Sequence, residues 1–343
     1  MASLVDQLSR RVFNRPGMGF PAARAAHGIG MNSLSRYISK WCKWAPEVVE
    51  FELACGEEKV RGKMYSAHNT DHVVRQIWMA GVGSYESPMP LVFAALTREK
   101  VWGTRTGTPD TRHAQQRIAH EPGNILIVGA SSGLYAILAG LGKGARMVHA
   151  FDPYPPAIRW LEKNIQLNGL EGKVKLANVA LGNAVGETDL FVPPARYGTT
   201  LETSASINPD YHEQVGQKLR VPMLTVDEFV RREVGARAVN VMLIDVEGFE
   251  HSVLEGAEAV LQTSRPVVAF EVLTRSTTQV ALLERIRKKH GYRCLVMEPL
   301  ELKVSEPVQP CGIHTNQLMV PEDGLDMVMV AARMAGVKFN RKV

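Results

Sequence analysis

The stretch NILIVGASSGLYAILAGLG, residues 124–142, decides the fold that this sequence predicts. It contains no charged residue, and it divides into an apolar run at 124–128, a turn from Gly129 to Gly133, and apolar residues at helical spacing. Because the stretch is rich in Gly and is interrupted by Asn and two Ser, a strand, a glycine turn and a buried helix account for it better than a membrane span.

The same alternation of strand and helix patterns continues to residue 298. Further strands are expected at 146–151, 174–179, 221–225, 239–245, 266–272 and 292–298. Helical patterns lie between them, with Thr225 as a plausible N-cap of one helix. Strands that alternate with crossover helices predict an α/β protein, with a mostly parallel sheet covered by helices on both faces. Residues 1–122 do not join this rhythm, and 48–65 read as a β-hairpin.

Two features favour a nucleotide-like ligand at the carboxyl edge of this sheet. The turn that begins at Gly129 and ends at Gly133 lets a ligand approach the backbone. Asp152 ends the second strand, where a carboxylate can accept hydrogen bonds from both ribose hydroxyls. The G-x-x-x-G spacing does not match the G-x-G-x-x-G of dinucleotide sites, so an NAD-dependent oxidoreductase is poorly supported.

A second stretch, VNVMLIDVEGFEHSVLEG at 239–256, ends an apolar strand in three carboxylates. Asp245 closes the strand at the ligand edge, which favours a functional role. Glu247 and Glu250 have a second interpretation, because acids in the first turn of a helix are stabilised by its positive end, by roughly 0.3–1 kcal/mol. Glu271 ends the neighbouring strand.

Asp245 and Glu271 together have two possible roles. They could accept a proton from the substrate or bind a divalent cation with waters, although the spacing indicates no further oxygen ligand and we predict no metal. His251 and His314 are candidate bases by residue type alone.

The charge of the chain is concentrated in an N-terminal arm. Residues 1–46 hold seven Lys or Arg and one Asp, a net +6, whereas the whole chain carries +5, so the remainder carries −1. Such an arm could contact RNA or an acidic protein partner, and its Arg-rich, acid-poor composition is also typical of organellar transit peptides. The four cysteines are scattered, which fits a reducing, intracellular compartment, either cytoplasmic or mitochondrial.

Six segments carry a resemblance to a known family: VGASSGLYAIL, HAFDPYPPAIRWLEKNIQLNG, VALGN, LTVDEF, LIDVEGFEHSVLEGAEAVL and RPVVAFEV. In this order they resemble the FkbM-type methyltransferases, class I enzymes that use S-adenosyl-L-methionine and mostly methylate hydroxyl groups. The resemblance covers roughly residues 80–322. It implies a Rossmann-like class I methyltransferase fold, with a mostly parallel seven-stranded sheet, helices on both faces and an N-terminal extension.

The resemblance also implies a division of the chain. Residues 1–122 would form a basic arm, a hairpin and cap helices, 123–322 the methyltransferase domain, and 323–343 a C-terminal helix with a basic tail. The acceptor would be a small molecule or a glycan-like hydroxyl compound.

The roles that the resemblance implies for single residues concern the cofactor and the reaction. The cofactor-binding residues would be Glu86, Gly129, Ala130, Ser131, Gly133, Asp152, Asn178 and Ala180. Of these, the glycines would line the methionine and ribose part of the cofactor, Asp152 would bind the ribose hydroxyls, and Glu86 would lie beside the methionine end. The segment 178–180 would flank the adenine. The catalytic residues would be Asp245, Glu271 and Glu247.

Three positions depart from the family pattern. The first strand of the family usually ends in D-x-G-A-N-x-G, whereas Ile127 replaces the acid and Ser131 the amide; Leu243 replaces a Lys that usually precedes D-V-E-G. These departures support an alternative: a degenerate methyltransferase fold that serves as a non-catalytic subunit or assembly factor of a larger, possibly mitochondrial, complex.

Overall fold

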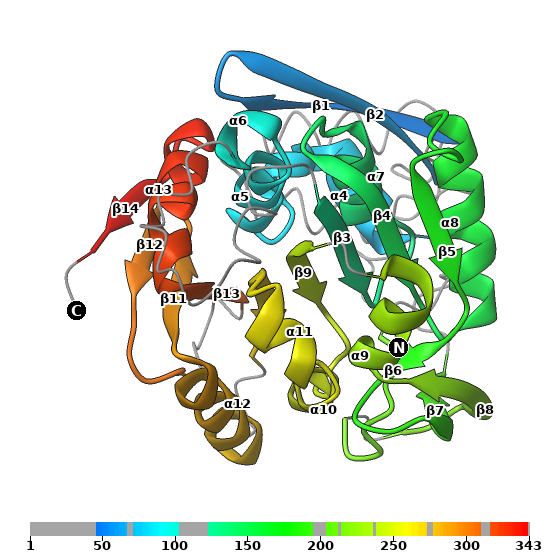
Figure 1. The fold of residues 1–343 in the computed structure, drawn as a ribbon. Coiled ribbons are helices and arrows are strands. Elements are labelled where there is room, and N and C mark those ends of the chain that lie inside the picture. The colour runs from blue at the N-terminus through cyan, green and yellow to red at the C-terminus, as the bar shows by residue number, and fades with distance from the viewer. Residues whose placement is uncertain are drawn as a thin grey trace, which may run out of the picture.

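A nine-stranded mixed sheet forms the centre of the protein in this computed structural model (Figure 1). The structure describes residues 46–66, 71–102, 123–194, 204–211, 214–235, 238–272, 277–309 and 316–341, so the basic arm lies outside the described residues. In spatial order the strands are β14 (Lys338–Asn340), β12 (Glu301–Val304), β11 (Tyr292–Glu298), β13 (Asn316–Pro321), β10 (Val267–Glu271), β9 (Val239–Ile244), β3 (Gly123–Val128), β4 (Ala145–Phe151) and β5 (Val174–Ala177).

The fold class predicted from the sequence is confirmed, but the expected count of seven strands is too small. Strand β12 returns antiparallel against β11, and β14 then adds parallel to β12. Strand β12 forms because the segment after β11 makes a tight hairpin, and β14 forms because the chain after the last helix turns back to the sheet edge. Part of the expected basic tail is therefore a strand. The strand expected at 221–225 instead belongs to a second sheet, and β13, which the sequence patterns did not predict, lies between β11 and β10.

The parallel core contains a topological switch at β3. From β3 the chain runs outward through β4 to β5 on one side, and it later fills the other side with β9 and β10. Loops that leave the carboxyl ends of β3 and β9 therefore diverge in opposite directions. A crevice forms where they separate, which is where open α/β sheets bind ligands.

The strand residues alternate between two apolar cores, one on each face of the sheet. On β3, Ile125 and Ile127 face one core, and Leu126 and Val128 face the other. The first core is covered by α4 (His72–Ala80), α5 (Met89–Leu96), α6 (Glu99–Trp102), α7 (Leu134–Leu141), α8 (Pro155–Leu167) and α13 (Leu325–Met334). The second is covered by α9 (Val226–Phe229), α10 (Glu250–Glu255), α11 (Glu258–Thr263) and α12 (Thr277–His290). This two-sided burial explains why strands such as β3 and β9 are apolar throughout.

The expected hairpin is formed by β1 (Val48–Cys55) and β2 (Glu58–Tyr65) (Figure 1, top). Strand β2 contacts α7 and α8. Asn164 of α8 and Asn168, the residue that follows the helix, bind the backbone of β2. Asn168 accepts from Lys63 N and donates to Lys63 O, and Asn164 accepts from Tyr65 N. The buried Asn164 also donates to Ser132 O in the glycine turn, at 2.7 Å. The N-terminal hairpin is therefore connected to the turn by one side chain.

A second, three-stranded sheet stands beside the carboxyl edge. It consists of β6 (Ala180–Leu181), β8 (Gln217–Leu224) and β7 (Gly186–Val192), in that order. Strands β7 and β8 pair antiparallel along their whole length. Thr225 then caps α9 by accepting from Glu228 N, as predicted. The remaining short helical turns are η1 (Val82–Ser84), η3 (Val230–Val234) and η4 (Glu322–Gly324).

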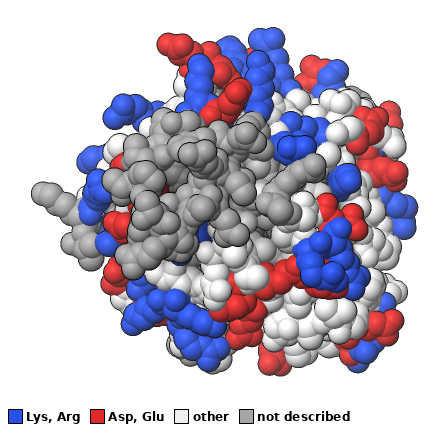
Figure 2. Space-filling view, in the orientation of Figure 1, with Lys and Arg blue, Asp and Glu red and all other residues white. Residues whose placement is uncertain are grey.

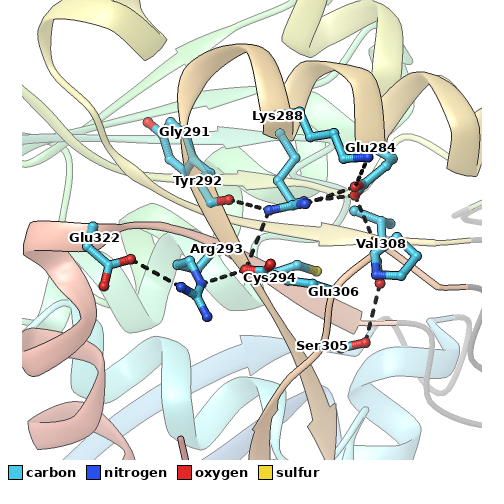
Figure 3. A network of polar contacts seen from close by, with 12 residues as sticks. Glu284, Lys288, Gly291, Tyr292, Arg293, Cys294, Ser305, Glu306, Val308 and Glu322 are labelled. Atoms are coloured by element: carbon cyan, nitrogen blue, oxygen red, sulfur yellow. Dashed lines mark hydrogen bonds and ion pairs between the residues drawn. The ribbon is translucent and has the colours of Figure 1, made fainter. Parts of the chain in front are cut away.

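An ion-pair network connects α12 to the antiparallel end of the large sheet (Figure 3). Arg287 donates two hydrogen bonds to the Glu284 carboxylate, at 2.7 and 2.8 Å, and one to Tyr292 O. Glu284 also accepts from Val308 N, and Arg293 pairs with Glu306. The side chains of Arg287 and Glu284 are 8% and 14% exposed, so this pair is nearly buried. The exposed Lys288 also pairs with Glu284, at 3.3 Å.

Replacing Arg287 by Met should lower the free energy of unfolding by about 1.5–3 kcal/mol at pH 7, because it removes the nearly buried cation of Glu284 and leaves only the exposed Lys288 to pair with this carboxylate. Arg287 is the main cause that lowers the pKa of Glu284 to about 2. The stabilisation is thus complete above the unfolded pKa, near 4.5, and is lost as the pH falls toward 2. Urea titrations at pH 7 and pH 3 should show the difference from wild type shrink in acid.

The matched control is Arg285→Met on the same helix. Arg285 is 66% exposed and pairs with Glu255 at 3.0 Å, so its loss should cost less than about 1 kcal/mol. Equal losses for the two variants would contradict the importance assigned to the buried pair.

The surface of the described residues carries mixed charges. Lys and Arg alternate with Asp and Glu over the face in Figure 2, and no broad expanse of one sign is visible on its described part. Within the described part of the chain, no helix combines the length and apolarity needed to cross a membrane.

Candidate functional site

A cleft opens at the carboxyl ends of the parallel strands, where the sheet switches direction. Its empty space, open solvent at the mouth included, is about 1160 Å³. Ten of the eleven residues predicted for the site line it: Glu86, Gly129, Ala130, Ser131, Gly133, Asp152, Ala180, Asp245, Glu247 and Glu271.

Packing inside the protein requires glycine at both ends of this turn, whether or not a ligand is bound. Gly129 has φ +84°, and a Cβ built on it would lie 1.7 Å from the backbone oxygen of Asp245. Asp245 N donates to Val128 O at 2.9 Å, so the ends of β3 and β9 touch at this point. Gly133 has φ +99°, and its Cβ would lie 2.3 Å from a methyl carbon of Leu161. The turn therefore fixes the position of Asp245.

Asp152 is held in place by two backbone donors. Its Oδ2 accepts from Ser131 N at 2.8 Å and its Oδ1 from Tyr154 N at 2.9 Å. Burial nevertheless raises its pKa to about 6. Each oxygen retains acceptor capacity, because a carboxylate has about four lone-pair sites. Asn178 does not line the cleft. Its side-chain amide donates to the backbone oxygen of Asp152 at 2.8 Å and so stabilises the end of β4.

The cleft differs in character on the two sides of β3. The β4 and β5 side is mostly apolar around Asp152, with Phe151, Ala157, Val179, Leu181 and Leu190 among its lining residues. The β9 and β10 side carries the carboxylates of Asp245, Glu247 and Glu271, and Glu86 adds a fourth from the N-terminal segment. Among the described lining residues there is no Lys, Arg or His.

Crowding of these carboxylates changes their protonation. Burial, followed by the charges of Glu86 and Glu271, raises the pKa of Asp245 well above its usual range. Burial and Glu271 raise the pKa of Glu247 to about 8, although a hydrogen bond from Tyr211 opposes the shift. Carboxyl groups in this state are partly protonated at neutral pH, and a cation placed among them would be strongly favoured.

The interpretation that Glu247 belongs to the first turn of a helix is wrong. Helix α10 begins at Glu250, whereas Glu247 precedes it with φ +55°. Its carboxylate accepts from the Tyr211 hydroxyl and its backbone oxygen from Ser206 Oγ. Glycine at 248 also has positive φ, so the loop turns sharply before the helix and directs Glu247 to the cleft.

Glu250 does lie in the first turn, but its carboxylate supports the loop instead of the helix end. Its Oε1 accepts from Val246 N at 3.1 Å and from Gly248 N at 3.2 Å, and its Oε2 accepts from Gln279 of α12. The side chain is fully buried, and burial raises its pKa to about 7. Glu250 therefore fixes the loop that carries Asp245 and Glu247.

Backbone strain is concentrated at this cleft. Four described residues other than glycine have a positive φ, and three of them, Glu86, Ser131 and Glu247, line it. Such conformations cost of order 1–3 kcal/mol each and persist where surrounding structure imposes them, often at functional sites.

Sequence reasoning missed Tyr135 and Tyr211, which contact Glu86 and Glu247 respectively. Tyr135 follows the glycine turn by two positions, and a tyrosine so close to this turn was the signal from which its place at the site could have been predicted.

The two histidines considered as bases are not placed in the cleft. His251 is half-buried on α10 and does not line the cleft, and His314 lies outside the described residues. Within the described ranges no group of three or more His, Cys, Asp or Glu is arranged to hold one metal ion.

Comparison with known families agrees with this geometry. The model of the methyltransferase FkbM domain matches residues 128–317, more than half of the chain. The protein belongs to the FkbM methyltransferase family. The matched region contains the glycine turn, Asp152, and the carboxylates of β9 and β10.

Solved structures that are similar to part of this chain include the following two. The methyltransferase FkbM of Methylobacillus flagellatus KT is 17% identical, with 58% of this chain and 43% of that chain covered and a TM-score of 0.39. The fibrillarin of Aeropyrum pernix, solved with natively bound S-adenosyl-L-methionine, is 13% identical over 58% of this chain and 66% of that one, with a TM-score of 0.32. This chain thus spans less than half of the first of these proteins. No curated protein sequence matches it.

Proposed function

We propose that the protein is an S-adenosyl-L-methionine-dependent methyltransferase that methylates a hydroxyl oxygen of a small-molecule or glycan-like acceptor. The observation that carries the proposal is the division of the cleft into an apolar side with Asp152 and an acidic side with four carboxylates. This donor set fits the cofactor, because a nucleoside suits the first side, and a sulfonium with an ammonium suits the second. Residues 123–322 would be the catalytic domain, 1–122 its cap, and 323–343 a C-terminal extension.

In this proposal each part of the cleft has a task in binding. Asp152 accepts hydrogen bonds from the ribose hydroxyls, and the apolar residues of segment 178–181 flank the adenine. The glycine turn at 129–133 leaves room for the ribose and methionine parts, and Glu86 lies beside the methionine end. When bound, S-adenosyl-L-methionine supplies a methyl group that is already activated for transfer.

The catalytic tasks left to the protein are to position the acceptor and to remove its proton. The acceptor oxygen bonds to the methyl carbon as the carbon–sulfur bond breaks, and the hydroxyl proton passes to a carboxylate. Asp245 and Glu271 would orient or deprotonate the acceptor, with Glu247 beside them. The pKa of Glu247, raised to about 8, suits a base that works near neutral pH.

Replacing Asp152 by Ala should weaken binding of S-adenosyl-L-methionine by at least about 100-fold, because two hydrogen bonds to a charged acceptor are lost. In wild type, affinity should fall as the pH drops below about 6, where Asp152 becomes protonated. Equilibrium dialysis with methyl-labelled cofactor between pH 5 and pH 8 measures both effects. A thermal melt of the variant checks that it remains folded, since Asp152 also accepts from Ser131 N and Tyr154 N.

A non-catalytic role has one observation in its favour. Ile127, which replaces the acid of the family pattern, is completely buried in the core that α7 covers, so β3 presents no carboxylate to the cleft. A folded wild-type protein that fails to bind S-adenosyl-L-methionine at millimolar concentration would support the role of a subunit or assembly factor.

A further inference from the structure

The carboxylate absent from β3 has a counterpart that enters the cleft from the N-terminal segment. Glu86 follows η1 and lines the cleft on its acidic side. Glu86 is exposed, and its φ of +42° is a backbone conformation that costs energy. Burial of the side chain therefore does not explain why the residue adopts this conformation. Contacts of Glu86 must therefore account for its position.

Tyr135 supplies such a contact. It lies in the first turn of α7, two residues after Gly133, and its hydroxyl donates to Glu86 Oε2 at 3.0 Å. The tyrosine is 8% exposed, and its ring meets Phe93 of α5 edge-on, with 5.3 Å between the ring centroids. Tyr135 is thus fixed by the core, whereas Glu86 is not.

The electrostatic environment agrees with this arrangement. Burial and the neighbouring Glu86 charge raise the pKa of Tyr135 well above its usual range, so the hydroxyl keeps its proton and remains a donor. The side chain of Tyr85 also hydrogen-bonds to Glu86. Neutral hydroxyl donors orient the carboxylate without placing a cation beside it, and acceptor capacity remains because a carboxylate has about four lone-pair sites. Glu86 is therefore positioned while it keeps acceptor sites for a cationic donor.

We propose that Tyr135 is a positioning residue that directs Glu86 to the ammonium group of the cofactor's methionine part, in place of the acid missing at Ile127. This inference rests on the proposed function. The hydroxyl of Tyr135 acts through Glu86, so it affects ligands that carry the amino-acid part and not ligands that lack it.

The test compares two ligands in calorimetric or competition titrations of the full chain. S-adenosylhomocysteine carries the ammonium group, and 5′-methylthioadenosine has the same nucleoside and a thioether but no amino-acid part. Tyr135→Phe keeps the ring and its contact with Phe93. It should weaken binding of S-adenosylhomocysteine about ten- to hundredfold, the effect of one hydrogen bond to a charged group, and leave binding of methylthioadenosine unchanged.

Two further variants make the result specific. In a Glu86→Gln background, adding Tyr135→Phe should cause no further loss, because one residue acts through the other. Tyr154 lines the cleft beside Asp152, so Tyr154→Phe should not separate the two ligands. Equal weakening of both ligands by Tyr135→Phe, no weakening of either, or additive losses in the double variant would overturn the inference. Failure of wild type to bind S-adenosylhomocysteine and S-adenosyl-L-methionine would instead contradict the proposed function itself.

Discussion

Replacing Gly129 by Ala is expected to lower the free energy of unfolding by about 3–5 kcal/mol, from positive-φ strain and overpacking together. The new Cβ would lie 1.7 Å from the Asp245 oxygen, and φ is +84°. Both clashing groups belong to the backbone, so neither can move by a change of rotamer. Because Asp245 must shift, binding of the cofactor should be lost as well. Urea denaturation and calorimetry measure the two effects.

Gly169→Ala is the matched control for this substitution. Gly169 also has a positive φ, +64°, but a Cβ there would have no heavy atom within 4 Å. Its replacement should cost only the conformational strain, about 1–2 kcal/mol, and leave binding intact. Equal destabilisation by the two substitutions would show that contact between the ends of β3 and β9 is not what requires glycine at 129.

Asp245→Asn should stabilise the ligand-free protein at pH 8 by about 1–3 kcal/mol while it weakens cofactor binding at least tenfold. Burial and neighbouring carboxylates raise the pKa of Asp245 above its unfolded value. The folded state then binds more protons than the unfolded state, so stability falls as the pH rises above about 4, the unfolded pKa of an Asp, and through the raised pKa of the folded state. Asn removes that cost of ionisation, and it also removes a negative charge that attracts the cationic ligand.

Chemical denaturation at pH 5 and pH 8 tests the sign of this effect. The gain from Asp245→Asn should be larger at pH 8 than at pH 5, because the raised pKa leaves more of the wild-type carboxyl protonated at the lower pH. Glu284→Gln is the control of opposite sign, because Arg287 lowers the pKa of Glu284 to about 2 and its loss should destabilise the protein at pH 8. Destabilisation by Asp245→Asn at pH 8 would show that the acidic cluster is not under electrostatic strain.

Local sequence patterns predicted the parallel strands of the core and the edge of the sheet at which the cleft lies. The short-range signals are the apolar runs at β3 and β9 and the glycine turn between β3 and α7. Because β3 and β9 pair in parallel, Gly129 and Asp245 lie at the same edge of the sheet. The reason for glycine at 129 was predicted only in part. We expected a ligand to approach the turn, whereas the Asp245 oxygen already stands where a Cβ would be.

The rest of the site depends on contacts between segments distant in sequence. Glu247 and Glu250 are three residues apart, yet one faces the cleft and the other is buried beneath the loop, because positive φ values at 247 and 248 reverse the chain between them. The pairing of Tyr135 with Glu86 spans 49 residues and that of Tyr211 with Glu247 spans 36. Periodicity and spacing along the chain carry no information about such contacts.

Titration calorimetry of the wild-type protein with S-adenosyl-L-methionine, in two buffers of different ionisation enthalpy at pH 7, tests the central claim most directly. The account predicts saturable one-site binding with a net release of protons, because a cation that enters among Asp245, Glu247 and Glu271 lowers the pKa values of carboxyls that are partly protonated beforehand. Absence of binding at millimolar ligand would contradict the proposed function, and binding without proton release would contradict the placement of the cationic end in the acidic cluster.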